Sequence, residues 1–176
     1  MKFVAIFLLL ALSLGACAEE KKPTTLRGVL LEQLRTTHNQ KDWFVPANVS
    51  VEGLTAEQAT WTDGHGNHSI GQIANHLVFW NSDQLARFKG ETPPKYSGDN
   101  NETFNNFDAK KWTDTVHHLD EVMVAWEKAV EGADDKKLQE WASAIAHIGA
   151  HNAYHTGQII YIRRVQGSWD PEKGVK

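Results

Sequence analysis

Three histidines recur at intervals of four in one C-terminal segment: His147, His151 and His155. Four residues make roughly one turn of an α-helix, so side chains at this spacing lie along one side of a helix. Two imidazoles at positions i and i+4 can bind one metal ion without bending the backbone. The spacing therefore predicts metal chemistry, provided that a further ligand comes from elsewhere in the chain.

The helix expected to carry these histidines runs through an apolar segment from Trp141 to Val165. At about 100° per residue, His151 and His155 fall within its apolar stripe, whereas His147 falls farther round the helix. A buried imidazole without a partner is costly. The two inner histidines therefore either hydrogen-bond to neighbouring groups or bind an ion, and a third histidine from another helix would favour the ion.

His76 is the first choice for that third ligand, because it lies in the middle of another predicted helix and borders its apolar stripe. His65 and His68 belong to the Gly-rich sequence Gly-His-Gly-Asn-His and are second choices, since a loop could bring either one to the ion. Three neutral imidazoles that leave positions open for water are typical of a catalytic metal site. The ligands suit a divalent first-row ion such as zinc or nickel, and ligand type alone does not choose between them.

Four amphipathic segments must position these side chains. The apolar spacing predicts helices over Thr25 to about Asp42, Ser69 to about Lys89, Asp108 to about Glu131, and from Asp134 or Asp135 to Arg164. Long loops are expected over 43–68, with a brief helical turn at 55–58, and over 91–107. With no convincing strand pattern, the fold class predicted is an all-α four-helix bundle with long loops between helices 1 and 2 and between helices 2 and 3.

The N-terminal segment is expected to lie outside the bundle. A basic start is followed by an apolar run over 3–14 that is too short to be a comfortable transmembrane helix. The sequence Leu-Gly-Ala-Cys that ends at Cys17 resembles the lipobox of bacterial lipoproteins, in which the signal is cut before the cysteine and the thiol is acylated. The alternative is an ordinary signal peptide with a chance cysteine.

The domain prediction follows from this lipobox. Residues 1–17 form a lipoprotein signal peptide, 18–24 a tether and 25–170 the helical bundle. We expect an exported protein that is attached to a bacterial membrane by a lipid on Cys17 and lies on the periplasmic or cell-surface side.

The net charge of −4, with acids and bases mixed along the chain, predicts no nucleic-acid partner. A homodimer is compatible with a bundle, but no remaining apolar stripe requires one.

Two stretches of the sequence resemble the DinB / YfiT-like superfamily. They are Ser-Ile-Gly-Gln-Ile-Ala-Asn-His-Leu at 69–77 and His-Asn-Ala-Tyr-His-Thr-Gly-Gln at 151–158. The resemblance extends over about 25–167 and implies a four-helix bundle with a histidine triad, which by position is His76, His151 and His155. Characterised relatives include transferases and isomerases that use mycothiol or bacillithiol, and metal-dependent hydrolase-like proteins. The export signal argues against a thiol cofactor, because such thiols are cytoplasmic.

Two functions are compatible with these observations. The first is a metal-dependent hydrolase or transferase that acts on a small molecule in an aromatic pocket, for which the candidates are Trp43, Phe44, Trp61 and Trp80. The catalytic residues stay open, with Tyr154 and Asn152 as candidates. A zincin protease is excluded, because Asn152 stands where that motif needs a glutamate base. The alternative is a lipid-anchored protein that binds a metal or ligand without turnover.

Overall fold

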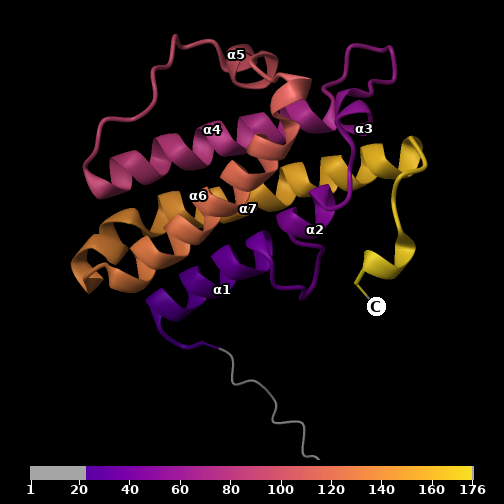
Figure 1. Ribbon diagram of the computed structural model, residues 1–176. Coiled ribbons are helices and arrows are strands. Elements are labelled where there is room, and N and C mark those ends of the chain that lie inside the picture. The colour runs from indigo at the N-terminus through magenta and orange to yellow at the C-terminus, as the bar shows by residue number, and fades with distance from the viewer. Residues whose placement is uncertain (1–22, 176) are drawn as a thin grey trace, which may run out of the picture.

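The computed structural model describes residues 23–175, and over this range the fold is all-α with no strand. Four long helices form the bundle: α1 (Leu26–His38), α4 (Ile70–Lys89), α6 (Trp112–Gly132) and α7 (Asp135–Val165). Both α1 and α4 pack against α6 and α7 (Figure 1). The predicted all-α four-helix bundle is confirmed. Residues 1–17, with Cys17, and most of the 18–24 tether lie outside the described residues.

The core lies where the apolar stripes of the four long helices meet. Its fully or almost fully buried members come from every one of them: Leu30, Leu34, Ile70, Leu77, Leu119, Trp126, Ile145 and Ile159. Burying apolar side chains of this size contributes about 1.5–3 kcal/mol each. This burial fixes the faces that α4 and α7 turn toward each other, and therefore the side chains that can meet between them.

Helix α4 begins at the capping box that its sequence predicts. The Ser69 hydroxyl accepts a hydrogen bond from the Gln72 backbone N–H, and the Gln72 side chain accepts one from the Ser69 backbone N–H. Helix α7 begins at Asp134, whose carboxylate accepts from the Lys137 N–H, and continues for 31 residues without a break. Caps of this kind satisfy donors that the first helical turn leaves free.

Helix α1 is shorter than its sequence suggests. It ends at His38 rather than near Asp42, and Asn39 leaves helical geometry with φ −143°. The reason is burial: His38 is inside the protein, whereas the four polar residues that follow it are exposed and have nothing to pack against. The predicted loop over 43–68 then contains two short helices, α2 (Ala47–Val51) and α3 (Ala56–Thr60), the second matching the expected turn at 55–58.

The segment 91–107 is not a plain loop. It contains the short helix α5 (Asn100–Asn105), which lies over α4 (Figure 1). The Asp99 carboxylate caps α5, and the helix buries Thr103 and Phe104 against the bundle. The expected start of the third long helix at Asp108 is likewise a short 3-10 turn, η1 (Ala109–Lys111), and α6 follows directly after it.

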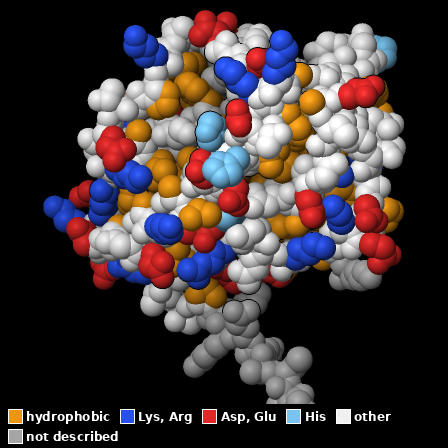
Figure 2. Space-filling view, viewed as in Figure 1, with side chains coloured by type: hydrophobic (Ala, Val, Ile, Leu, Met, Phe, Trp, Pro, Cys, Tyr) orange, Lys and Arg blue, Asp and Glu red, His pale blue; other side chains and the backbone are white. Residues whose placement is uncertain are grey.

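After α7 the chain folds back along the bundle and ends in the 3-10 turn η2 (Pro171–Lys173). The buried Arg163 stabilises this C-terminal segment, because its guanidinium donates hydrogen bonds to the backbone carbonyls of Ser50, Glu52 and Ser168. On the face drawn in Figure 2, Lys and Arg side chains are interspersed with Asp and Glu. None of the described helices is long and apolar enough to span a bilayer.

Candidate metal centre

The structure brings His76 of α4 together with His151 and His155 of α7. Each of the three offers a ring nitrogen, and these nitrogens all lie within 4.8 Å of one another. The ring centroid of His76 lies 5.1 Å from that of His151 and 4.7 Å from that of His155. The centroids of the two α7 rings lie 4.5 Å apart. His76 and His155 are buried and His151 is partly buried. The three histidines chosen from the sequence therefore form one cluster.

A pair of asparagines next to the cluster fixes the alignment of α4 and α7. The Asn81 amide donates to Asn152 Oδ1 at 2.8 Å, and the Asn152 amide donates to Asn81 Oδ1 at 3.3 Å. Both side chains are fully buried, where an unpaired amide would be costly. Asn152, a catalytic candidate from the sequence, is thus placed in a helix-to-helix contact and lines no pocket beside the cluster.

Thr103 of α5 determines which nitrogen of His76 faces the cluster. His76 Nδ1 lies 2.6 Å from Thr103 Oγ1, and that hydroxyl donates its hydrogen to the Asn100 carbonyl at 2.7 Å. A hydroxyl has one hydrogen, so toward His76 it can only accept, and His76 Nδ1 must carry the proton. Nε2 of the neutral ring then presents its lone pair to the other two histidines.

Gln158 of α7 determines which nitrogen of His155 faces the cluster. His155 Nδ1 lies 2.7 Å from the Gln158 amide oxygen, which can only accept, so this nitrogen also carries the proton. The Gln158 amide nitrogen donates to the Tyr154 hydroxyl at 3.2 Å, which fixes the amide orientation. Metal-binding histidines usually donate their second N–H in this way, because the bond orients the ring and raises its basicity.

His151 completes the set. Its Nε2 lies 3.1 Å from His76 Nε2. Two nitrogens that bind one zinc ion at about 2.0–2.1 Å with a tetrahedral angle lie about 3.4 Å apart, so this separation fits a shared ion. His151 Nδ1 is buried and has no hydrogen-bond partner among the described residues. The ring is therefore held by packing and by its neighbours in the cluster.

The electrostatics of the cluster favour neutral rings. Burial lowers the pKa of His76 to about 3, with smaller contributions from the nearby imidazoles, and burial lowers the pKa of His151 to about 4. Burial also lowers the pKa of His155, against an opposing effect of the bond to Gln158. Metal ions bind the neutral form of histidine. Three neutral imidazoles, two of them with fixed lone pairs, are a donor set that could hold a divalent ion.

Phe104 separates the cluster from the second-choice histidine His68. The Phe104 ring stacks on His76 at 3.8 Å and on His68 at 4.0 Å. Two rings stacked in this way must lie on opposite faces of Phe104, so His68 stays outside the cluster. His65 is exposed on the same loop, and its backbone N–H bonds to Asp63. Neither second choice belongs to the group of nitrogens that converge.

The three histidines open into a pocket of about 600 Å³. Beside them its walls include Trp80, Gln84, Asn100, Phe104, His147 and Ile148. A second pocket, of about 730 Å³, contains Trp61, His68, Tyr154 and Tyr161, and it shares His155 and Phe104 with the first. The cluster therefore lies at the boundary between two hollows.

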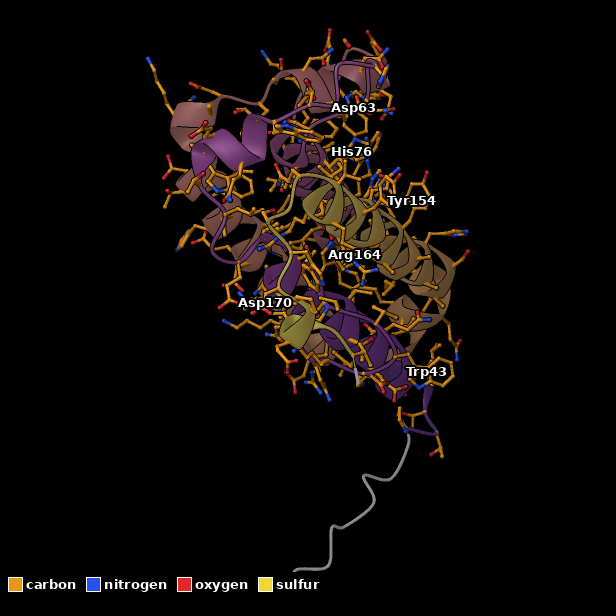
Figure 3. The ribbon with its side chains drawn as sticks, turned by 90° about the vertical axis from the view of Figure 1, so that its right-hand side faces the viewer. Trp43, Asp63, His76, Tyr154, Arg164 and Asp170 are labelled. Carbon is orange, nitrogen blue, oxygen red and sulfur yellow. The ribbon has the colours of Figure 1, made fainter. Side chains whose placement is uncertain are left out.

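The predicted aromatic lining is right for two residues and wrong for two. Trp80 and Trp61 line the two pockets beside the cluster. Trp43 is 80% exposed and lies far from His76 in Figure 3, and Phe44 lines a different pocket near Trp169. The pocket of Phe44 includes Ile160 and Arg164 of α7, and neither Trp43 nor Phe44 lines a pocket beside the cluster. Tyr154 lines the second pocket and is 64% exposed.

Sequence reasoning missed the contribution of α5. Thr103, Phe104 and Asn100 bond to, stack on or enclose the cluster, yet they belong to a polar stretch that was expected to be a loop. The one local signal is Asp99, whose carboxylate caps a helix of six residues. His147, which the spacing places away from the buried stripe, is exposed at the edge of the 600 Å³ pocket, with Nδ1 3.4 Å from Ser143 Oγ.

Comparison with known proteins gives one family. A profile described as the DinB superfamily matches residues 47–159, which is more than half of the chain. The match contains all three clustered histidines and the α5 segment, and it begins within α2, so that α1 lies outside it. No curated protein and no solved structure matches the chain.

Proposed function

Because the chain belongs to the DinB superfamily, we propose that it binds a divalent metal ion through His76, His151 and His155 and acts on a small molecule at that ion. The observation that carries the proposal is the buried cluster of three histidines, whose nitrogens converge within 4.8 Å. Two of these nitrogens, Nε2 of His76 and Nε2 of His151, lie 3.1 Å apart, close to the separation expected for two ligands of one ion.

A divalent ion held by three neutral imidazoles would act as a Lewis acid and lower the pKa of a bound water. The chain's own residues prepare the site. Thr103 and Gln158 hold His76 and His155 with their lone pairs facing inward, and Phe104 shields one side of His76 from solvent. Zinc and nickel both suit three nitrogen donors.

The reaction class that we propose is hydrolysis or group transfer. It is supported by the pocket of about 600 Å³, which is within the size range of small-molecule sites and has apolar walls with a few polar groups. Among the described residues that line this pocket there is no Asp, Glu, Lys or Arg, whereas the second pocket contains Asp63 and Tyr154. A proton acceptor supplied by the protein would therefore be an imidazole in the first pocket, or Asp63 or Tyr154 in the second.

The lack of a carboxylate among the described residues of the 600 Å³ pocket supports a second candidate, a protein that binds metal and ligand without turnover. The two candidates differ in what the bound ion does to a substrate, and not in the ligand set. Turnover of any ester, amide or phosphoester that is lost in the His76→Ala variant would favour the enzyme. Tight ligand binding without turnover across such a panel would favour the binding protein.

The cellular location is also part of the proposal. The lipobox sequence that ends at Cys17 supports an exported protein with a lipid anchor, on the periplasmic or cell-surface side of a bacterial membrane. Metabolic labelling with a fatty-acid analogue tests it. Label in the wild-type chain and none in Cys17→Ser is expected, and equal labelling of the two would contradict a lipid at this position.

Elemental analysis tests the metal site. The purified chain is loaded with zinc or nickel, freed of excess ion and measured beside a His76→Ala/His151→Ala/His155→Ala variant. We expect about one ion per wild-type chain and almost none in the variant. The matched control replaces three histidines outside the cluster, His65, His117 and His118, which are exposed. Equal metal content in wild type and in the cluster variant would overturn the site.

A further inference from the structure

The pocket in front of the histidine cluster has an unbalanced charge once it holds a divalent ion. None of the described residues that line it is acidic. The carboxylates on the neighbouring elements are engaged elsewhere: Asp83 pairs with Arg87, Glu102 accepts from Ser97, and Asp63 of the second pocket accepts from the His65 N–H and the Asn67 amide. Neutral imidazoles do not cancel the charge of the ion, and in a partly buried site that charge is only weakly screened. The occupant that complements such a pocket is an anion.

The walls of the pocket indicate what kind of anion fits. Trp80, Phe104 and Ile148 contribute apolar surface, and the Trp80 indole N–H is already bonded to Asn100 Oδ1 at 3.1 Å. A fully hydrated inorganic anion would leave these faces without contacts, whereas an acid with an apolar or aromatic body would cover them. The volume of about 600 Å³ is ample for a single ring and its substituents.

Three polar side chains of the pocket lie outside the metal cluster: Gln84 and Asn100 are bonded to Asp83 and Trp80, which leaves His147 as the candidate for a contact with an occupant. His147 lies eight residues before His155, a rise of about 12 Å along a helix, which is too far for both to bind one ion. Its side chain nevertheless lines the same pocket as the cluster, and its closest polar contact is a long one to Ser143. An imidazole carries at least one N–H in either protonation state, so His147 can donate to an acid held at the cluster.

We propose that this pocket binds a small organic acid with an apolar body, and that His147 is the residue that selects the acid. The carboxylate occupies the open side of the ion, the body lies between Trp80, Phe104 and Ile148, and His147 donates a hydrogen bond to the bound acid. The inference deepens the proposed function and rests on it, because the carboxylate needs the ion.

The test uses the full chain loaded with cobalt(II), whose visible spectrum reports ligands that reach the ion. Benzoate is titrated as the probe, with benzamide as its neutral counterpart and benzylamine as its cationic one. We expect benzoate to change the spectrum with a dissociation constant at least tenfold lower than either counterpart. His147→Ala should weaken benzoate binding about tenfold or more, the usual effect of losing a hydrogen bond to a charged group, and leave cobalt content unchanged.

His147→Gln keeps an N–H donor and should recover most of the affinity. The matched control is His117→Ala, which removes an exposed histidine on α6 and should leave benzoate binding unchanged. If cobalt is bound but benzoate is not preferred over benzamide, or if His147→Ala binds benzoate like the wild type, this inference is overturned and the metal site stands. A wild-type chain that holds no cobalt would overturn both.

Discussion

The Nε2 atoms of His76 and His151 lie 3.1 Å apart, although 75 positions separate the two residues in the chain. Since Thr103 places the proton of His76 on Nδ1, two lone pairs would repel at this distance unless a proton or a cation lay between them. In the ion-free protein the proton must therefore come from His151. A metal ion that replaces it would bind both nitrogens at once, so the packing of α4 on α7 has already brought the two ligands together.

Replacing Thr103 with valine should weaken metal binding without touching a ligand. Valine keeps the shape of threonine but cannot accept the proton of His76 Nδ1, so the ring is no longer held in one tautomer. We expect a loss of about 10–100-fold in zinc affinity, measured by competition with a chromophoric chelator. Thr103→Ser keeps the acceptor and should bind like the wild type.

The control for Thr103 is Thr115→Val, which removes another buried hydroxyl. Thr115 bonds to the Lys111 carbonyl at the start of α6 and lines neither pocket beside the cluster. It should lose some stability and keep its zinc affinity. A Thr103→Val protein whose zinc affinity equals that of the wild type would show that the hydroxyl does not position His76.

The ion-free protein should lose stability as the solution becomes mildly acidic. Burial lowers the pKa of His76 to about 3 and that of His151 to about 4, against 6.5 for an ordinary histidine. As the pH falls from about 6.5 toward 5, the unfolded chain takes up protons that the folded chain does not. The free energy of unfolding then falls by up to about 1.4 kcal/mol per pH unit for each histidine, and above pH 7 this contribution is flat.

Urea unfolding in the presence of a chelator at pH 7, 6 and 5 measures this slope. A His76→Leu/His151→Leu variant has no such protons to take up when it unfolds and should show a shallower dependence on pH. His117→Leu, which replaces an exposed histidine, should keep the wild-type slope. Parallel slopes for the wild type and the double variant would contradict neutral histidines in the cluster.

His38 should matter to stability and not to the metal. Its side chain is 1% exposed, with Nδ1 2.6 Å from Glu127 and Nε2 2.8 Å from Asp120. Both acids belong to α6, so the His38 ring links the end of α1 to that helix through two short polar contacts. Losing a hydrogen bond to a charged group costs about 1.5–3 kcal/mol. We expect His38→Ala to lower the free energy of unfolding by about that amount in urea.

The exposed His118 on the same helix as these acids gives the control. His118→Ala should stay within about 0.5 kcal/mol of the wild type, as is usual for surface substitutions. Both variants should keep one metal ion per chain, because neither residue lies in the cluster. A His38→Ala protein as stable as the wild type would mean that the two acids gain nothing from it.

Asn152 lies between the two α7 ligands, and its replacement separates a structural from a catalytic role. Its amide is paired with Asn81 in the core, so Asn152→Ala should destabilise the fold by about 1–3 kcal/mol, the cost of leaving a buried polar group without its partner. Metal content should stay near that of the wild type. Urea unfolding and elemental analysis of the same sample measure both, and Asn106→Ala, at an exposed position, is the control. An unchanged stability with lost metal would contradict the structural role.

The long helices and two of the three clustered histidines could be predicted because the rules that place them are local. Helical periodicity depends on neighbours three and four residues away, and His151 and His155 are one turn apart on the same stripe. His76 needed a further assumption, that α4 turns its border toward α7. The apolar core confirms that assumption, because the burial of Leu77 and Ile159 fixes the rotation of α4 and α7 and so directs His76 toward α7.

Helix α5 could not be predicted on the same grounds. A helix of six residues is too short to be stable by itself, and Phe104 is the one large apolar residue in its sequence. It forms because Phe104 stacks on His76 and because Thr103 bonds to the same ring. His76 and Thr103 are 27 positions apart in the chain, and no spacing rule connects them. The end of α1 was misplaced for a related reason, since the burial of His38 depends on α6.

Phe104 lines both pockets and lies between the rings of His68 and His76. Both pockets also contain His155, so the Phe104 ring separates two hollows that reach the same histidine. The bulk of this one side chain limits how long a molecule can be and still reach the histidines from either side. A smaller residue at this position would remove the wall between the two pockets and leave room for a longer molecule beside the three histidines.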